Sequence, residues 1–249
     1  MPLLEVHNVS KRFGGLAAVD SVSFQIEEGE LVALVGPNGA GKTSLFHTIG
    51  GYHKADAGTI RFAGHDITRM PAHRRARLGL ARTFQIPRPF GGATVRENAA
   101  MGALFGAAQP RMNVRRALEE ADRCLARVGL AGLENHAAAD LTPVQQKLLE
   151  IARSLAMHPR LLLLDEAMAG MNPTEVDSVV ALIRSLHEEE HIAVVGLVEH
   201  IMRAVVGLAR RVLVMHQGKL LIDAPTEQAL TDPRVVEVYL GHAAAPSNS

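Results

Sequence analysis

The chain has 249 residues, 47% of them hydrophobic, and its 26 Lys and Arg residues balance 26 Asp and Glu residues. This length and composition are those of a folded globular protein and exclude a chain that is disordered throughout. The formal net charge of zero gives no bulk attraction to nucleic acid or anionic lipid, so we expect no nucleic-acid partner. The single cysteine, Cys124, excludes an internal disulfide and is expected to pack on a helix face.

No segment predicts a membrane span. The first residues, MPLLEVHNVSKRF, lack the long apolar core of a secretory signal. No later run offers the ~20 uninterrupted apolar residues that cross a bilayer. We therefore expect a cytoplasmic chain that reaches a membrane only through other proteins.

Short apolar runs alternate with stretches of helical periodicity, which predicts an α/β fold. The predicted strands are Leu31–Val35, Leu161–Leu164, Ile192–Val198 and Val212–Met215. The second and third contain few polar residues, as is typical of parallel strands covered by helices on both faces. We expect them to form the central sheet of one core.

The middle of the chain, approximately residues 89–156, has a different character. Strand signals fade there, and Val114–Val128 and Val144–Ala156 carry apolar residues at helical spacing. The pattern predicts one domain over residues 1–241, in which a helical subdomain interrupts a core made of residues 1–88 and 157–241. Residues 242–249, rich in Ala and Ser, predict a disordered tail.

The strongest motif directly follows the first predicted strand. Its residues are Gly36, Pro37, Asn38, Gly39, Ala40, Gly41, Lys42 and Thr43, and Ser44 then opens a helical run to Ile49. This G-x-x-x-x-G-K-[ST] pattern between a strand and a helix predicts a phosphate-binding loop. Its N–H groups face phosphate oxygens, Lys42 reaches the terminal phosphates, and Thr43 offers a hydroxyl to Mg²⁺.

An acidic pair, Asp165 and Glu166, ends the strand that begins at Leu161. The carboxyl ends of parallel strands are where α/β sheets bind ligands. We expect Asp165 to hold the Mg²⁺ shell, and Glu166, on the alternate face, to orient or deprotonate an attacking water.

Gln85 and His200 also end apolar segments, from which a polar side chain reaches a γ-phosphate or its water. Neither residue is informative alone, because a single His or Gln is usually a surface residue. Their order relative to the phosphate-binding loop and the acidic pair is what supports them.

With these motifs in this order, the chain resembles the ABC ATPase family from Val9 to Gly241. The resemblance implies ATP as cofactor and a RecA-like P-loop core with an N-terminal antiparallel β portion and an inserted α-helical subdomain. It also implies that two ATPase subunits close head to tail over two ATP molecules. Phe13 then stacks on adenine, Gln85 senses Mg²⁺ and water, and His200 lies near the γ-phosphate.

Four details look like the ATPases of branched-chain amino acid importers. They are Arg82–Gln85, Ala169–Pro173, Glu199–His200 and Tyr239–Gly241. The resemblance implies a position on the cytoplasmic face of the membrane, two transmembrane permease subunits and, indirectly, a solute-binding protein. An ATPase of a lipopolysaccharide-type exporter and a weakly hydrolysing regulatory subunit remain alternatives.

The chain departs from the family at its Leu-Ser-Gly-Gly-Gln signature, which here reads Leu-Thr-Pro-Val-Gln from Leu141 to Gln145. Pro143 has no N–H to donate to a phosphate, and Val144 adds a branched side chain. The same residues predict a helix start with Thr142 as N-cap and Gln145 three residues later.

The altered signature leaves two interpretations open: a reduced contact of Thr142 and Gln145 with the ATP of the opposite subunit, or a purely structural cap. The first favours a heterodimer with a subunit that carries a normal signature, although a homodimer is possible.

The basic run His73–Arg77 predicts a solvated helix face rather than a lipid or nucleic-acid contact.

Overall fold

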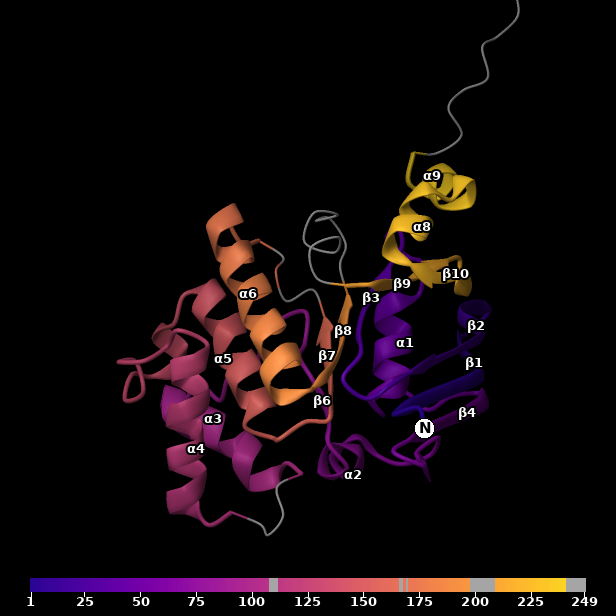
Figure 1. The fold of residues 1–249 in the computed structure, drawn as a ribbon. Coiled ribbons are helices and arrows are strands. Elements are labelled where there is room, and N and C mark those ends of the chain that lie inside the picture. Colours follow the sequence, from indigo (N-terminus) through magenta and orange to yellow (C-terminus); the bar gives the residue numbers. More distant parts are fainter. Residues whose placement is uncertain (108–111, 166–167, 169, 198–208, 241–249) are drawn as a thin grey trace, which may run out of the picture.

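The computed structural model describes residues 1–107, 112–165, 168, 170–197 and 209–240 (Figure 1). The strands are β1 Leu4–Phe13, β2 Leu16–Ile26, β3 Leu31–Val35, β4 Ala57–Phe62, β5 His65–Asp66, β6 Leu80–Arg82, β7 Leu161–Asp165, β8 Ala193–Leu197, β9 Arg211–His216 and β10 Lys219–Pro225. The helices are α1 Lys42–Ile49, α2 Ala72–Arg77, α3 Val95–Phe105, α4 Val114–Arg127, α5 Pro143–Leu155, α6 Pro173–Glu190, α8 Thr226–Thr231 and α9 Pro233–Leu240, with a 3-10 turn at Ala138–Asp140.

The central sheet has six strands in the order β10-β9-β3-β8-β7-β6. All neighbours pair in parallel except β10, which pairs antiparallel with β9 at one edge. Strand β7 is buried along its whole length. Its residues alternate between two cores, with Leu162 and Leu164 in one and Leu161 and Leu163 in the other. Burial of both faces explains why β7 is a continuous apolar run.

A second sheet, with strand order β2-β1-β4-β5, is antiparallel throughout. It shares a hydrophobic core with α1, to which Val6, Phe46 and Phe62 contribute. Figure 1 shows this sheet on one side of the central sheet and the helices α3, α4 and α5 on the other. The predicted α/β class, with its N-terminal antiparallel portion, is confirmed.

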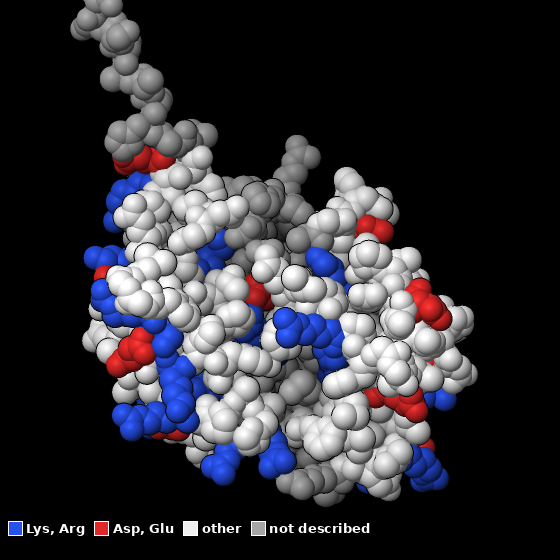
Figure 2. All heavy atoms as spheres, turned by 180° about the vertical axis from the view of Figure 1, so that it is seen from behind, with Lys and Arg blue, Asp and Glu red and all other residues white. Residues whose placement is uncertain are grey.

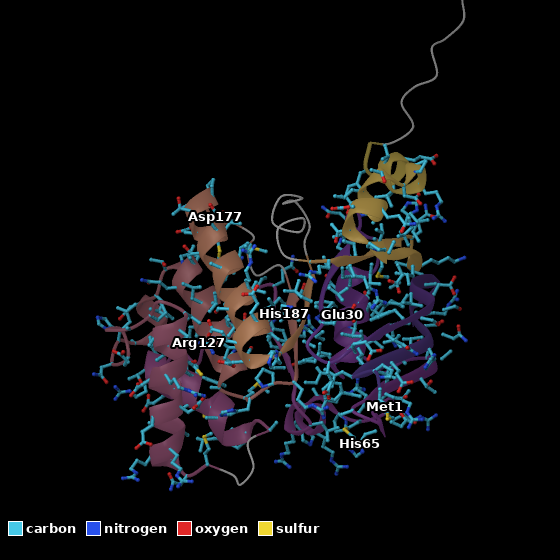
Figure 3. All side chains as sticks on the ribbon, viewed as in Figure 1. Met1, Glu30, His65, Arg127, Asp177 and His187 are labelled. Carbon is cyan, nitrogen blue, oxygen red and sulfur yellow. The ribbon has the colours of Figure 1, made fainter. Side chains whose placement is uncertain are left out.

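Helices α3, α4 and α5 form one bundle around a shared core that includes Ala99, Ala121 and Ile151. Arg127, at the end of α4, lies on the side of the bundle that faces α6 (Figure 3), with its guanidinium 3.7 Å from a carboxylate oxygen of Glu189. The helices predicted in this stretch are present, with ends that differ by one residue.

Cys124 is buried on α4, as predicted for a small apolar side chain. Burial raises the pKa of its thiol to about 12, so the thiol is protonated and unreactive near neutral pH.

The prediction that the basic run His73–Arg77 is a solvated face is wrong for Arg75. His73, Arg74 and Arg77 are exposed, but Arg75 is 1% exposed. Its guanidinium donates to four carbonyl oxygens, those of Thr48 and Ile49 at the end of α1 and those of Thr68 and Met70. A cation at the carboxyl end of a helix is favoured by the helix dipole, and Asp66 adds a favourable charge, which together explain how Arg75 is buried without a direct ion pair among the described residues.

Both acidic and basic side chains appear on the face of the molecule shown in Figure 2. Among the helices of the described part of the chain, none has the length and apolar character needed to cross a membrane.

Candidate nucleotide-binding site

The predicted phosphate-binding loop connects β3 to α1, as expected. Gly36 and Gly41 both have positive φ, of 150° and 99°. A Cβ at Gly36 would lie 2.2 Å from the Met215 carbonyl oxygen, and one at Gly41 would lie 2.0 Å from that of Ala18. Only glycine fits these positions, because the loop bends tightly against two other strands.

The loop leaves donors available at the start of α1. Among the described residues no side chain caps this helix, so its first N–H groups keep their capacity for an anion. Lys42 is 3% exposed, and its ammonium donates to the carbonyl oxygens of Gly36 at 2.7 Å and Pro37 at 3.0 Å. The side chain therefore lies folded over the loop, where a phosphate would meet its positive charge.

The strand that ends in Asp165 stops level with the strand that precedes the loop. Leu34 of β3 and Asp165 of β7 both pair with Leu197 of β8. With one strand between them, the two strand ends are about 10 Å apart. The sheet thus brings together two of the sequence-predicted elements, which are separated in the chain by the whole helical bundle.

Asp165 is fully buried and is held by two residues of the neighbouring strand end. Its carboxylate accepts a hydrogen bond of 2.6 Å from Arg82, and its backbone N–H donates to the Thr83 hydroxyl at 3.0 Å. Sequence reasoning did not assign Arg82 to the site, although a charged residue beside the predicted Gln85 was a signal. The pairing follows from the adjacency of β6 and β7.

The donor set fits a magnesium ion shared with phosphates. The Thr43 hydroxyl and Asp165 carboxylate are hard oxygen ligands of the kind Mg²⁺ prefers. No cluster of three or more His, Cys, Asp or Glu residues in the described part of the chain could hold a metal by itself. A Mg²⁺ ion that is bound together with phosphates commonly takes only one or two protein ligands.

Two further predicted residues have described positions. Gln85 is exposed, three residues beyond the end of β6. Phe13 ends β1 and is 44% exposed, with the Lys11 ammonium 5.4 Å from its ring centroid and the His53 ring edge-on at 5.1 Å. An exposed ring face is what stacking on a base requires. The predicted Glu166 and His200 lie outside the described residues.

Thr142 and Gln145 form the predicted helix start, a reciprocal capping box with Pro143 in the first turn of α5. Each side chain uses an oxygen to accept the backbone N–H of the other residue. These two hydrogen bonds use only oxygen acceptors of the side chains. The O–H of Thr142 and the side-chain N–H groups of Gln145 are not used by them.

A groove of about 740 Å³ lies beside the site, between the core and the helical bundle. It is lined by the aromatic residues Tyr52, Phe84, Phe90 and Phe105 and by the arginines Arg77, Arg82, Arg88 and Arg153. No Asp or Glu is among the described residues that line it.

Behind the groove, Glu150 of α5 is 3% exposed. Burial raises the pKa of its carboxyl to about 7, although the Phe84 N–H and the nearby Arg153 and Arg82 oppose the shift.

A glycine-rich loop that opens a helix, an acidic strand end level with it and a helical insertion together define a P-loop nucleotide-binding protein. A family model described as ABC transporter matches residues 19–169, and the chain belongs to this family as an ATP-binding subunit. The resemblance inferred from the motifs is confirmed.

Curated relatives match along nearly the whole chain. The high-affinity branched-chain amino acid transport ATP-binding protein BraF of Pseudomonas aeruginosa is 40% identical over 97% of this chain and 99% of its own length. The protein LivG of Escherichia coli, of the same description, is 39% identical with the same coverage.

Solved structures give the same result. A nucleotide-free ATP-binding cassette from an ABC transporter has a TM-score of 0.85 and 29% identity, covering 97% of this chain and all of its own. The ADP conformation of another ATP-binding cassette has a TM-score of 0.82 and 30% identity, covering 97% of this chain and 99% of its own.

Proposed function

We propose that this subunit hydrolyses ATP to power the import of branched-chain amino acids, or of related amino acids or amides. The observation that carries the substrate class is the 40% identity to BraF over nearly the full length of both chains. The phosphate-binding loop and the buried Asp165 support the phosphate-binding and metal-binding parts of the proposed ATPase site.

The proposed roles rest on the sequence motifs and, for the residues that the structure describes, on their placement as well. Lys42 and the N–H groups from Gly36 to Ser44 bind the phosphates, and Phe13 stacks on adenine. Thr43, Gln85 and Asp165 would hold Mg²⁺, which would neutralise charge on the phosphates. Glu166 orients or deprotonates the attacking water, and His200 lies beside the γ-phosphate.

We assign the groove between the core and the helical bundle to a permease segment. Its aromatic rings offer apolar contact, and its four arginines, with no acid among the described lining residues, favour a segment that carries a carboxylate. In this proposal residues 89–156 form the lobe that passes movement to two permeases on the cytoplasmic face of the membrane. A solute-binding protein delivers the substrate to those permeases.

The altered signature favours a heterodimer. The capping box ties Thr142 and Gln145 to the start of their own helix, and Pro143 offers no N–H to a phosphate across the interface. A second ATPase subunit with a normal signature would complete the site at this chain's own loop. ATPase assays with and without a candidate partner test this proposal, and strong cooperative turnover by the chain alone would contradict it.

The variant Glu166→Gln tests the proposed hydrolysis. It should bind ATP as the wild type does and lose turnover, because an amide cannot accept the proton of water. The exposed Glu188→Gln on α6 is the matched control and should keep turnover. Wild-type hydrolysis by Glu166→Gln would exclude the assignment of Glu166.

Uptake of labelled leucine into vesicles that contain the reconstituted transporter tests the proposed substrate class. ATP-dependent leucine uptake supports it. Turnover that leucine and other amino acids leave unaffected, with no uptake, would contradict amino-acid import while leaving the ATPase assignment intact.

A further inference from the structure

One buried arginine contacts both the proposed metal ligand and the proposed docking groove. Arg82 is 8% exposed, and its Nη2 donates to the Asp165 carboxylate at 2.6 Å. The carbon at the centre of its guanidinium lies 5.5 Å from the ring centroid of Tyr52 and 5.2 Å from that of Phe84. Both rings line the groove, and they pack edge to face at 5.2 Å. Arg82 therefore contacts both the proposed metal site and the groove.

The hydrogen bonding of this guanidinium is incomplete in the described part of the chain. Its Nε donates to the Thr83 carbonyl oxygen at 3.1 Å, and its Nη2 donates to Asp165. Its Nη1 is buried and has no acceptor among the described residues. A buried charged donor without an acceptor is costly, so an acceptor brought into the groove would stabilise Arg82.

The charge balance gives the direction of the coupling. Arg82 forms an ion pair with the buried carboxylate of Asp165. If Asp165 binds Mg²⁺, its carboxylate shares its negative charge between the metal and Arg82. The positive charge of the buried Arg82 is then less fully neutralised. The groove offers Arg82 no replacement acid among its described lining residues. Glu150 lies near Arg82 but does not line the groove, so a carboxylate brought into the groove would restore the balance there.

We propose that Arg82 is a positioning residue that couples metal binding at Asp165 to occupation of the groove by a carboxylate of the permease segment. Engagement of Mg²⁺ by Asp165 frees Arg82 to bind that carboxylate, and the carboxylate in turn makes Asp165 more available to Mg²⁺. The two effects are equal in free energy, because coupling between binding sites is reciprocal. This inference rests on the proposed function, which supplies both the Mg²⁺–ATP and the permease.

Tyr52 provides a spectroscopic measure of Arg82 that does not depend on hydrolysis. The chain has two tyrosines, Tyr52 and Tyr239, so labelling with 3-fluorotyrosine gives two ¹⁹F signals that Tyr239→Phe assigns. Addition of Mg²⁺ to the ATP-loaded chain should shift the Tyr52 signal by more than its linewidth, because the cation stacked on that ring changes partner. The ³¹P signals of ATP report nucleotide and Mg²⁺ binding independently.

Arg82→Lys keeps the positive charge but removes the planar guanidinium. It should lose most of the Tyr52 shift, whereas Arg74→Lys, at an exposed arginine that does not line the groove, should retain it. An unmoved Tyr52 signal in the wild type when ³¹P reports bound Mg²⁺–ATP would overturn the inference, as would an unchanged shift in Arg82→Lys. If ³¹P reports no ATP binding, the proposed function itself is wrong.

Asp165→Asn gives a second measurement that does not depend on the folding of Arg82→Lys. It removes the charge that Arg82 balances, so without metal its Tyr52 signal should move toward the position seen in the Mg²⁺-loaded wild type. A signal at the metal-free wild-type position would contradict the coupling.

The permease half of the proposal is tested with the two permease subunits in detergent, in a Glu166→Gln background that keeps ATP intact. Mg²⁺ should tighten binding of the ATP-loaded subunit to the permeases by about tenfold. Arg82→Lys should lose most of this gain, and Arg74→Lys should keep it. An equal gain in all three proteins would overturn the coupling, whereas no binding by the wild type would overturn the assignment of the groove.

Discussion

Thr142 and Gln145 hold each other's backbone amides: the Gln145 N–H donates to the Thr142 hydroxyl oxygen at 3.3 Å, and the Thr142 N–H donates to the Gln145 amide oxygen at 2.9 Å. The altered signature thus begins α5 with a complete capping box. The helix start does not need the glycines of the family signature. This separates two roles of the segment, capping its own helix and contacting a nucleotide, that substitutions can test one at a time.

Thr142→Ala should destabilise the chain by about 1 kcal/mol, because it leaves the Gln145 N–H without its side-chain acceptor. Urea unfolding followed by circular dichroism measures the change. Thr142→Ser keeps the hydroxyl and should stay close to the wild type. Equal stability of Thr142→Ala and wild type would show that the cap makes no net contribution.

Lys42→Ala should weaken ATP binding by at least about tenfold, because it removes the charged donor that meets the terminal phosphates. Titration with a fluorescent ATP analogue measures the affinity. Lys54→Ala removes an exposed lysine outside the loop and should bind ATP like the wild type. Unchanged affinity in Lys42→Ala would remove Lys42 from the site.

Arg75→Met should cost about 3 kcal/mol of stability, because four carbonyl oxygens lose a buried donor. Arg74→Met, one residue earlier and exposed on the same helix, should stay within about 0.5 kcal/mol of the wild type. Denaturant midpoints of the two variants provide the comparison. Similar midpoints would contradict a structural role for the buried guanidinium.

Glu150 should make stability depend on pH. Burial raises the pKa of its carboxyl in the folded chain to about 7, above the ordinary value of 4.5. Between these two pKa values the folded state therefore binds more protons than the unfolded state. The contribution of Glu150 to the free energy of unfolding is fully present below pH 4.5 and is lost as the pH rises through about 7. The effect is on the order of 3 kcal/mol.

Glu150→Gln has no carboxyl to ionise. Its free energy of unfolding, relative to that of the wild type, should therefore rise from about pH 5 to about pH 8, because the wild-type carboxyl loses its proton over this range. Urea unfolding at several pH values measures this difference. A difference that does not vary with pH would exclude ionisation of Glu150 as its cause. His47, whose pKa burial lowers to about 4, remains in both proteins, so its opposite effect cancels.

The sequence by itself determined those features that depend on neighbouring residues. The loop from Gly36 to Thr43 needs glycines at fixed positions for its backbone conformation, and the start of α5 needs a cap and a residue three positions later. Strand β7 is recognisable because both of its faces are buried. Local conformation and periodic burial leave a direct record in the order of residue types.

Only the tertiary structure decided which distant residues share an environment. Arg82 and Asp165 are 83 residues apart, and their ion pair exists because β6 and β7 are neighbours in the sheet. Arg75 stands in a basic run that predicts an exposed face, yet the end of α1, 26 and 27 residues earlier in the chain, supplies two of the four carbonyl oxygens that accept from it. Such partners come from the packing of separate elements, so the residues near each arginine in the sequence do not specify them.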